Sequence, residues 1–470
     1  MTDELWRQTA TTLAGMIRAK EVSAREVVES HLARIDAVNS QVNAITVVLA
    51  DSALELAATA DEATAAGEDL GPLHGVPMTI KENIDLAGSP TTSGVAALAE
   101  AVPLKDAPSI GHLKNAGAIP IGRTNLPDFA LRWHTDNDLR GPTINPWDPR
   151  RTPGGSSGGD GVALAVGMTP LGNGNDLGGS LRVPSLCNGT TAIRPTQGRV
   201  ASASDLREGG SPMSFQLMAV QGPMARSVED LRLALEVASQ PDPRDPWWTP
   251  APLRGPAPDG PIRVAVTDAS SADADVQAAV RSAARALSDA GYELEEVDPP
   301  SLTELVEHWR RLVWTEIEHG FLSVMEPIAS KDALRFLSLW SQIAESGDRG
   351  TYIDDLTRRN AIAAEWSLFL DTFPLVLGPV CGVQPFKVGD DLAGTAEVTA
   401  IMDGFGLTVA VNDLGLPAVA LPTGTAEVDG RDFPQGVQVI ATRYREDLCL
   451  DAAQAIEASL GALTPIDPRP

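Results

Sequence analysis

The first residues that could carry chemistry are two adjacent serines inside a glycine-rich stretch. Residues 153–159 read PGGSSGG, so four glycines surround Ser156 and Ser157. Glycine adopts positive φ angles without a steric penalty, and such a backbone brings its N–H groups close to a bound group. A flexible turn has the same composition. This stretch alone therefore leaves a functional and a purely structural interpretation open.

A second glycine-rich stretch, residues 172–184, reads GNGNDLGGSLRVP and holds Ser180 near its end. The concave donor set that would stabilise a developing oxyanion consists of the successive N–H groups of Leu177, Gly178, Gly179 and Ser180. A dinucleotide-binding fingerprint would need glycine where Leu177 stands, and no phosphate-binding GK[ST] run is present. Ser180 would attack a carbonyl only if a base took its proton, since a serine hydroxyl is a weak nucleophile at neutral pH.

Lys81 is the candidate base. It ends the apolar run 76–80, VPMTI, which predicts a strand that carries the lysine into the interior. Burial disfavours the charged ammonium and lowers its pKa, which leaves a neutral amine that can accept a proton. The alternative is a lysine at a strand end that reaches solvent or pairs with Glu82 or Asp85.

Histidine is the more common base for a serine, but the histidines of this sequence are poorly placed. The run GGSSG at 154–158 matches the G-x-S-x-G nucleophile elbow, which needs an acid and then a histidine downstream. Only His308 and His319 follow, both in sequence with a helical pattern. His74 stands beside glycine before the predicted strand, where we expect a hydrogen-bonded structural role. The elbow interpretation therefore lacks its base.

Two oppositely charged residues flank Ser180. We predict that Asp176 and Arg182 form an ion pair or a set of hydrogen bonds that holds the loop in place. That is a supporting role rather than direct chemistry, and Ser157 is assigned to the same supporting group.

Several kinds of element must position these groups. Residues 1–65 have a helical pattern, with a capping box, SARE, at 23–26. From 71 to about 200, short apolar runs broken by turn residues predict buried strands that alternate with helices and functional loops. A strand-helix-strand unit is predicted over 263–297, and residues 302–370 are mostly helical.

A substrate pocket must be shaped outside the motif segments. The loop 128–143 and the helical block 302–370 are rich in large aromatic residues, which small-molecule pockets favour. The pocket residues that we predict from these segments are Phe129, Trp133, Trp309 and Trp314. A place in the hydrophobic core is the alternative for the tryptophans.

The composition of the 470-residue chain is that of a globular protein and argues against several classes of partner. The net charge of 36 − 63 = −27 repels phosphate backbones, so nucleic acid is not an expected partner. No apolar run approaches the length of a membrane span and no secretory signal is visible, which favours the cytoplasm and no membrane partner. The three cysteines are far apart, so they form no complete disulfide framework and no metal motif.

Three spaced motifs together resemble the amidase-signature family. They are GPLHGVP with a strand and a lysine at 71–81, GGSSGG at 154–159 and DLGGSLRVP at 176–184. The spacings of the candidate residues, 156 − 81 = 75 and 180 − 156 = 24, are typical of the family. Flanking runs such as GRTN, NPW, RPTQGR, GLP and GVQ also agree, so the resemblance covers nearly the whole chain.

The resemblance implies a serine hydrolase. Ser180 would attack the carbonyl carbon, Ser156 would relay the proton to a neutral Lys81, and the peptide bond before Ser156 would be cis. The N–H groups of residues 177–180 would hold the oxyanion. The resemblance implies no metal and no cofactor, a small-molecule amide-like substrate and, because dimers are common in the family, a homodimer as one assembly.

The fold that the resemblance implies is a single α/β domain over residues 1–470, with one large mixed β-sheet covered by helices on both faces. Three positions depart from the family pattern: Asn175 replaces the usual threonine, Asp160 stands where serine is common, and Arg194 replaces a frequent lysine. None of these departures removes a catalytic atom. They bear on loop detail and substrate choice.

Three other functions stay open. The same chemistry could act on a carbamate, a hydrazide or an aryl ester. A glutamine-dependent tRNA amidotransferase subunit is similar to the same family, but the charge of −27 and the run QGRVAS at 197–202, in place of that subunit's YGRVSR, count against it. A non-catalytic binding protein on this fold would have no need of the intact Ser-Ser-Lys set.

Overall fold

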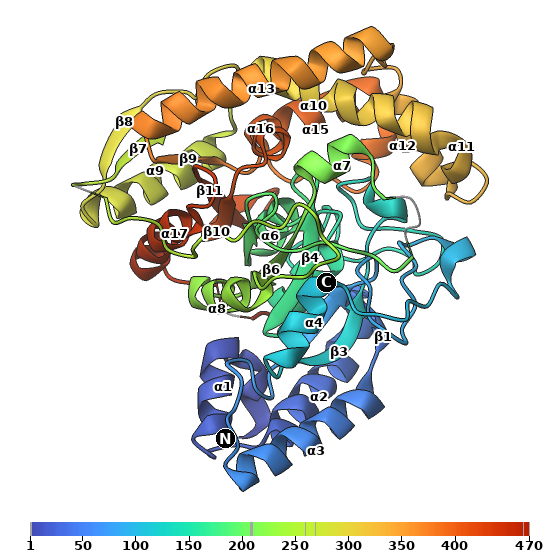
Figure 1. Cartoon of the computed structure of the whole chain (residues 1–470), viewed down its shortest axis with the longest axis vertical. Helices are drawn as coiled ribbons and strands as arrows, with labels where there is room; N and C mark the ends of the chain where they lie inside the picture. The colour runs from blue at the N-terminus through green and yellow to red at the C-terminus, as the bar shows by residue number, and fades with distance from the viewer. Residues whose placement is uncertain (1, 207–209, 259, 268, 464, 470) are drawn as a thin grey trace.

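An eleven-stranded mixed β-sheet runs through the described part of the chain (Figure 1). The computed structural model describes residues 2–206, 210–258, 260–267, 269–463 and 465–469. In order across the sheet the strands are β1 (Ile45–Val48), β3 (Ile119–Thr124), β2 (Pro77–Lys81), β4 (Leu171–Asp176), β6 (Val220–Ala225), β5 (Thr191–Arg194), β10 (Ala418–Val428), β11 (Arg431–Ala441), β9 (Leu375–Pro379), β7 (Arg263–Val266) and β8 (Glu293–Glu296). Strand β2 is parallel to β3 and β4, and β7 is parallel to β8 and β9, whereas the other neighbours are antiparallel. The predicted α/β fold with a large mixed sheet is confirmed.

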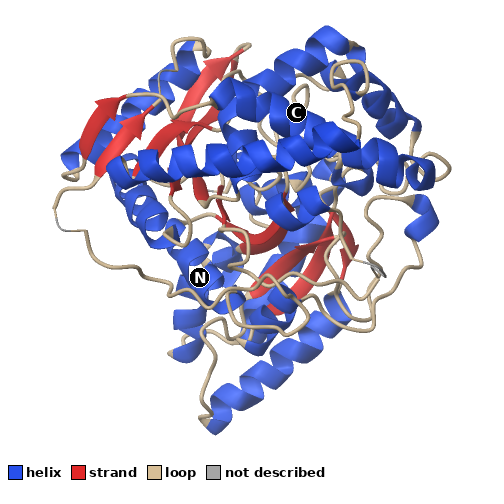
Figure 2. Ribbon diagram, turned by 45° about the horizontal axis from the view of Figure 1, so that its top comes forward, coloured by secondary structure: helices blue, strands red, loops and turns tan. Residues whose placement is uncertain are grey.

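Both faces of this sheet are apolar. In β9, Leu375 and Leu377 enter one core cluster while Val376 enters another. In β11, Val439 and Ile440 divide between the same two clusters. Because successive side chains of a strand point to opposite faces, helices must cover both faces of the sheet, and Figure 2 shows them doing so.

Three groups of helices cover the sheet. Those that share the core of Leu375 and Leu377 are α1 (Ala10–Arg18), α4 (Pro108–Asn115), α8 (Val228–Ala238), α9 (Ala274–Asp289) and α17 (Glu446–Leu460). Those on the opposite face are α10 (Leu302–Glu316), α12 (Lys331–Trp340), α13 (Arg349–Thr372), α15 (Thr395–Gly404) and α16 (Gly406–Leu414). Those around β1 and β3 are α2 (Ala24–Val42), α3 (Ala50–Ala66) and α5 (Gly158–Ala165). The shorter helices are η1 (Thr2–Arg7), η2 (Ala96–Leu98), η3 (Asp128–Ala130), α6 (Arg182–Asn188), α7 (Met213–Met218), the π-helical η4 (Ile317–Phe321), α11 (Leu322–Met325) and α14 (Asp390–Ala393).

The N-terminal region differs from its prediction in one respect. The capping box at 23–26 is present and opens α2. However, the helical prediction for 1–65 is wrong for Ile45–Val48, which form the edge strand β1. Helix α2 ends where Asn43 adopts a left-handed φ of 48°, and Asn39 Oδ1 accepts a hydrogen bond from the N–H of the first strand residue. The β-branched run ITVV then pairs antiparallel with β3, which suits such side chains better than a helix does.

Two other segment predictions are confirmed. The strand-helix-strand unit over 263–297 consists of β7, α9 and β8, with its two strands parallel. The block 302–370 is helical from α10 into α13 and forms the upper part of the view in Figure 1. None of the described helices has both the length and the apolar character needed to cross a membrane.

Candidate active site

Lys81 ends strand β2, the third strand from one edge of the sheet, and is fully buried. Its Nζ donates hydrogen bonds to Ser156 Oγ (2.7 Å) and to Asn175 Oδ1 (2.6 Å). The Asn175 amide is held in this orientation because its Nδ2 donates to Asn83 Oδ1 at 2.9 Å. The lysine therefore neither reaches solvent nor pairs with a neighbouring acid, and it joins two of the three predicted motif segments.

The glycines around Ser156 serve close packing. The peptide bond between Gly155 and Ser156 is cis, as the family resemblance implied. A Cβ atom on Gly155 would lie 2.5 Å from the Arg132 carbonyl oxygen, and one on Gly159 would lie 2.4 Å from the Asn125 nitrogen. Contacts this short with backbone atoms exclude any side chain. The stretch is thus a tightly packed turn rather than a flexible one.

Burial changes the acid–base properties of Lys81. Loss of hydration lowers the pKa of its ammonium from 10.5 to about 7, although the negative charges of Asp160 and Asp176 oppose this change. A large fraction of the lysine is then neutral near physiological pH, and a neutral amine has a lone pair that can accept a proton.

Asp160 is a buried carboxylate that sequence reasoning treated only as a departure in loop detail. It lies in the first turn of α5, where its two carboxylate oxygens accept hydrogen bonds from Thr79 (3.0 Å) and Thr124 (2.7 Å). Burial raises the pKa of Asp160, against the effect of the two hydroxyl bonds and of the Lys81 charge. Since Lys81 and Asp160 each influence the ionisation of the other, they titrate as a pair.

The loop between β4 and α6 is held by the predicted ion pair. Arg182 Nε lies 3.1 Å from Asp176 Oδ2, and both side chains are fully buried. Burial raises the pKa of Asp176, but the charge of Arg182 and its hydrogen bond outweigh burial, so the net shift is downward and the group stays ionised. Asp176 also accepts hydrogen bonds from the backbone N–H groups of Gly179 (2.7 Å) and Leu181 (3.2 Å).

Ser157 links the two serine-bearing segments. Its backbone N–H donates to the carbonyl oxygen of Ser180 at 3.2 Å, and its Oγ lies 3.5 Å from the carbonyl oxygen of Asn175. Ser180 retains 8% exposure, so its side chain is close to the surface of this buried assembly. The structure therefore brings the 71–81, 154–159 and 176–184 segments together at one place.

The four N–H groups predicted to face an oxyanion are not equivalent. Gly179 uses its N–H in the bond to Asp176. By contrast, the N–H groups of Leu177, Gly178 and Ser180 donate to no group within the described residues. The predicted set therefore contains three unpaired N–H groups and one that is bound to Asp176.

The tryptophans predicted for the substrate pocket are buried in a core cluster. Trp133, Trp309 and Trp314 belong to one apolar cluster, with the rings of Trp133 and Trp309 6.1 Å apart, and Phe129 packs against its edge. Trp133 Nε1 donates to the Gly178 carbonyl (2.8 Å) and Trp309 Nε1 to the Leu177 carbonyl (3.1 Å). These two residues therefore touch the predicted site through its backbone.

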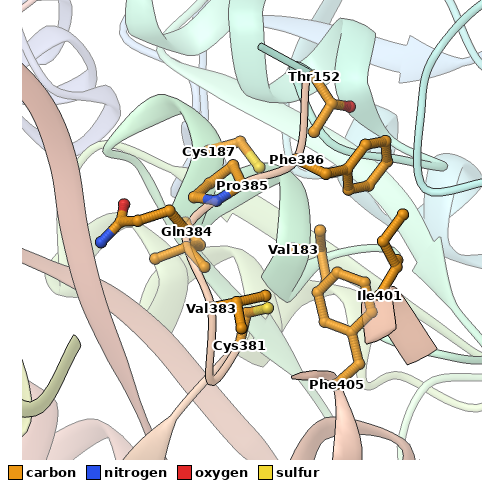
Figure 3. Close-up of a pocket in the computed structure, with 11 residues that line it drawn as sticks. Thr152, Val183, Cys187, Cys381, Val383, Gln384, Pro385, Phe386, Ile401 and Phe405 are labelled. Atoms are coloured by element: carbon orange, nitrogen blue, oxygen red, sulfur yellow. The ribbon is translucent and has the colours of Figure 1, made fainter. Parts of the chain in front are cut away.

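Other members of the same cluster form most of the wall of a cavity. Its empty space of about 280 Å³ includes open solvent, and it is lined by Thr152, Val183, Leu186, Cys187, Cys381, Val383, Gln384, Pro385, Phe386, Ile401 and Phe405. Figure 3 shows the segment from Cys381 to Pro385 on one side and Val183, Ile401 and Phe405 on the other. Val183, one of the wall residues, lies in α6, three positions after Ser180. None of the four predicted aromatic residues lines this cavity.

Sequence reasoning missed the residues that reach the site from the C-terminal half of the chain. Asn412 Nδ2 donates to Asp176 Oδ1 (2.7 Å) although the two residues are 236 positions apart. The cavity wall after β9 likewise carries no motif that marks it as functional. The run GVQ at 436–438 was one available signal, because Gln438 accepts a hydrogen bond from Arg182 at 2.8 Å.

Comparisons with known proteins agree over almost the whole chain. A family model described as Amidase matches residues 26–450. The chain is 44% identical over 466 residues to an indoleacetamide hydrolase of Bradyrhizobium diazoefficiens, which covers 98% of this chain and 88% of that relative. It is 33% identical over 486 residues to a glutamyl-tRNA(Gln) amidotransferase subunit of Deinococcus radiodurans, which covers 96% of this chain and 97% of that relative. The structure of a bacterial aryl acylamidase of the amidase-signature enzymes superposes with a TM-score of 0.83 at 26% identity, covering 97% of this chain and 96% of that one.

Proposed function

Because this chain belongs to the amidase family and is an amidase, we propose that it hydrolyses a small aromatic amide of the indoleacetamide kind through an acyl-enzyme on Ser180. The observation that carries the assignment of catalytic groups is the buried contact of 2.7 Å between Lys81 Nζ and Ser156 Oγ. It supports a relay in which Ser180 gives its proton to Ser156 and Ser156 gives its own proton to Lys81.

The relay requires that Lys81 be neutral at the start. A neutral amine has two N–H donors and one lone pair. One N–H then keeps the bond to Asn175 Oδ1, and the lone pair faces Ser156 Oγ, whose hydroxyl becomes the donor. The pKa of about 7 for Lys81 supports such a state near neutral pH.

The reaction proceeds by two acyl transfers. Ser180 Oγ forms a bond to the amide carbon, and the oxyanion receives hydrogen bonds from the unpaired N–H groups of Leu177, Gly178 and Ser180 itself. Lys81 returns its proton through Ser156 to the departing nitrogen, which leaves as ammonia from a primary amide. Water then attacks the ester on Ser180 and gives its proton through Ser156 to Lys81. The proton returns by the same relay to Ser180 Oγ as the ester bond breaks, which releases the carboxylic acid.

The substrate assignment rests on a relative and on the apolar character of the cavity walls. The relative of 44% identity is an indoleacetamide hydrolase. The walls of the cavity are apolar apart from Thr152 and Gln384. Walls of this kind suit an aromatic group better than a charged amino acid.

A substrate panel tests this assignment. We expect kcat/KM to be highest for indoleacetamide, lower for acetamide, and negligible for glutamine. Matched carbamate, hydrazide and aryl ester substrates show whether the acyl or the leaving group is selected. Glutamine as the best substrate, with turnover dependent on added partner subunits, would instead assign the chain to an amidotransferase.

Bulk added to the cavity should affect substrates according to their size. Val383→Phe, in the wall after β9, is expected to lower kcat/KM for indoleacetamide by roughly tenfold and to leave acetamide hydrolysis nearly unchanged. The control is Val388→Phe, since Val388 is 52% exposed on the same segment and does not line the cavity. Equal effects of Val383→Phe on both substrates would show that the acyl group of the substrate binds outside this cavity.

The pH dependence should report the Lys81–Asp160 pair. Because the base acts in its neutral form, kcat/KM for an amide should rise with pH through an apparent pKa of about 7. Asp160→Asn removes a negative charge that favours the ammonium, so the pKa of Lys81 falls and the rising limb moves to lower pH. Steady-state pH profiles of both proteins measure this shift. A limb that stays in place or moves upward would show that Asp160 does not set the ionisation of the base.

A further inference from the structure

Four successive carbonyl groups in the backbone of residues 176–180 each accept a hydrogen bond. The oxygen of Asp176 accepts from Asn412 Nδ2 (3.3 Å), and that of Gly179 accepts from the Val183 N–H (2.7 Å). Between them, the Leu177 and Gly178 oxygens accept from the two indole N–H groups described above, those of Trp309 and Trp133. Three of these four donors are buried side chains from segments remote in sequence.

This arrangement determines where the N–H groups point. In a trans peptide the carbonyl oxygen and the following N–H point in opposite directions within one plane. A donor bound to the carbonyl of Leu177 therefore directs the N–H of Gly178 to the opposite side. Each of the four peptide planes that carry the N–H groups of residues 177–180 is fixed in this way.

The peptide plane between Leu177 and Gly178 depends on Trp309 more than the next plane depends on Trp133. The peptide plane between Gly178 and Gly179 is held at both ends, because the Gly179 N–H donates to Asp176 and the Gly178 carbonyl accepts from Trp133. The Gly178 N–H, in contrast, is unpaired within the described chain, so Trp309 supplies the only hydrogen bond to that plane. The Trp309 ring also packs on the loop, since a Cβ atom on Gly178 would lie 2.6 Å from Trp309 Cζ2.

We propose that Trp309, assisted by Trp133 and Asn412, is a positioning residue that orients the oxyanion donors of this amidase. The inference rests on the proposed role of Ser180 and the N–H groups beside it. Two adjacent glycines make this loop intrinsically mobile, and mobile donors would have to be ordered during the reaction. A bound carbonyl also polarises its amide and strengthens the N–H as a donor.

The chain offers a matched control for the indole N–H. Trp340 stacks on Trp309 with ring centroids 5.7 Å apart, is buried in the same cluster, and its Nε1 has no hydrogen-bond partner among the described residues. Trp309→Phe and Trp340→Phe thus remove similar ring area from one cluster, but only the first removes a bound N–H. Trp133→Phe is a second test variant, with a smaller expected effect because its plane keeps the bond to Asp176.

The experiment measures kcat, KM and Tm for the three variants on a primary amide. We expect Trp309→Phe to lower kcat by roughly 10- to 100-fold with KM little changed, while Trp340→Phe stays near wild type at a similar Tm. Inhibition by a trifluoromethyl ketone analogue, which forms an oxyanion adduct, should weaken in Trp309→Phe, whereas inhibition by the planar carboxylate product should not. Should Trp309→Phe not fold, Trp133→Phe carries the same comparison.

Two results would overturn the proposal. One is a Trp309→Phe enzyme whose kcat equals that of Trp340→Phe. The other is equal weakening of ketone and carboxylate inhibition, which indicates a general packing defect. Either result leaves Ser180→Ala inactive, so the proposed function is tested separately by that variant.

Discussion

Ser180→Ala is expected to lose amide turnover by about 10⁴-fold or more, because it removes the atom that forms the acyl-enzyme. The substitution deletes one hydroxyl group from a residue that is 8% exposed, so the protein should unfold at nearly the same temperature as the wild type. Labelling by a fluorophosphonate, which requires the nucleophile, should disappear. Turnover, labelling followed by mass spectrometry, and Tm measure these three effects.

Ser185→Ala is the matched control for this result. Ser185 lies in α6, is buried, and its Oγ has no hydrogen-bond partner among the described residues. Its loss should leave turnover near wild type. Residual activity of Ser180→Ala above a trace would remove Ser180 from the role of nucleophile.

Lys81→Met should cause the second largest loss, of about 10³-fold or more for amides, since it removes the group that accepts the relayed proton. Methionine matches the unbranched shape of lysine and carries no charge, which limits disturbance of the buried site. The rising limb of the pH profile should disappear with the lysine. Aryl esters have better leaving groups and need less proton transfer, so their hydrolysis should fall less.

Lys114→Met serves as the control for loss of a lysine. Lys114 lies at a partly exposed position in α4 and pairs with Asp106 at 2.6 Å. Its kcat/KM profile should overlay that of the wild type. An unchanged pH limb in Lys81→Met, or equal losses for amides and esters, would assign the base to another group.

Much of the fold follows from local patterns that the sequence displays directly. The run VPMTI predicted the buried strand β2, and SARE predicted the start of α2. Both predictions were possible because the hydrophobic pattern of a strand and the capping of a helix depend only on neighbouring residues. The edge strand β1 was missed since its four residues follow a long helix. Only its pairing with β3, which residues 119–124 supply, makes it a strand.

The candidate site divides in the same way. Lys81, Ser156 and Ser180 could be chosen from the sequence because each stands in a short motif whose glycines, strand end or flanking acid are local features. The ion pair of Asp176 with Arg182 was predictable for the same reason, since six positions separate the two residues. Trp133 and Trp309, two of the four aromatic residues predicted for the pocket, contact the backbone of residues 178 and 177, and these contacts depend on packing.

The sequence by itself determined the candidate reacting groups, because residue type and local context single out Ser180 and Lys81, and the resemblance to the amidase-signature family adds Ser156 as the relay. Only the tertiary structure decided the pKa of Lys81, since burial by many elements lowers it while the charge of Asp160, 79 positions away (160 − 81 = 79), opposes that change. The same holds for the cavity after β9 and for the bonds from Trp133, Trp309 and Asn412. Desolvation and hydrogen-bond geometry are properties of groups that meet in space, and folding brings these groups together from distant segments of the chain.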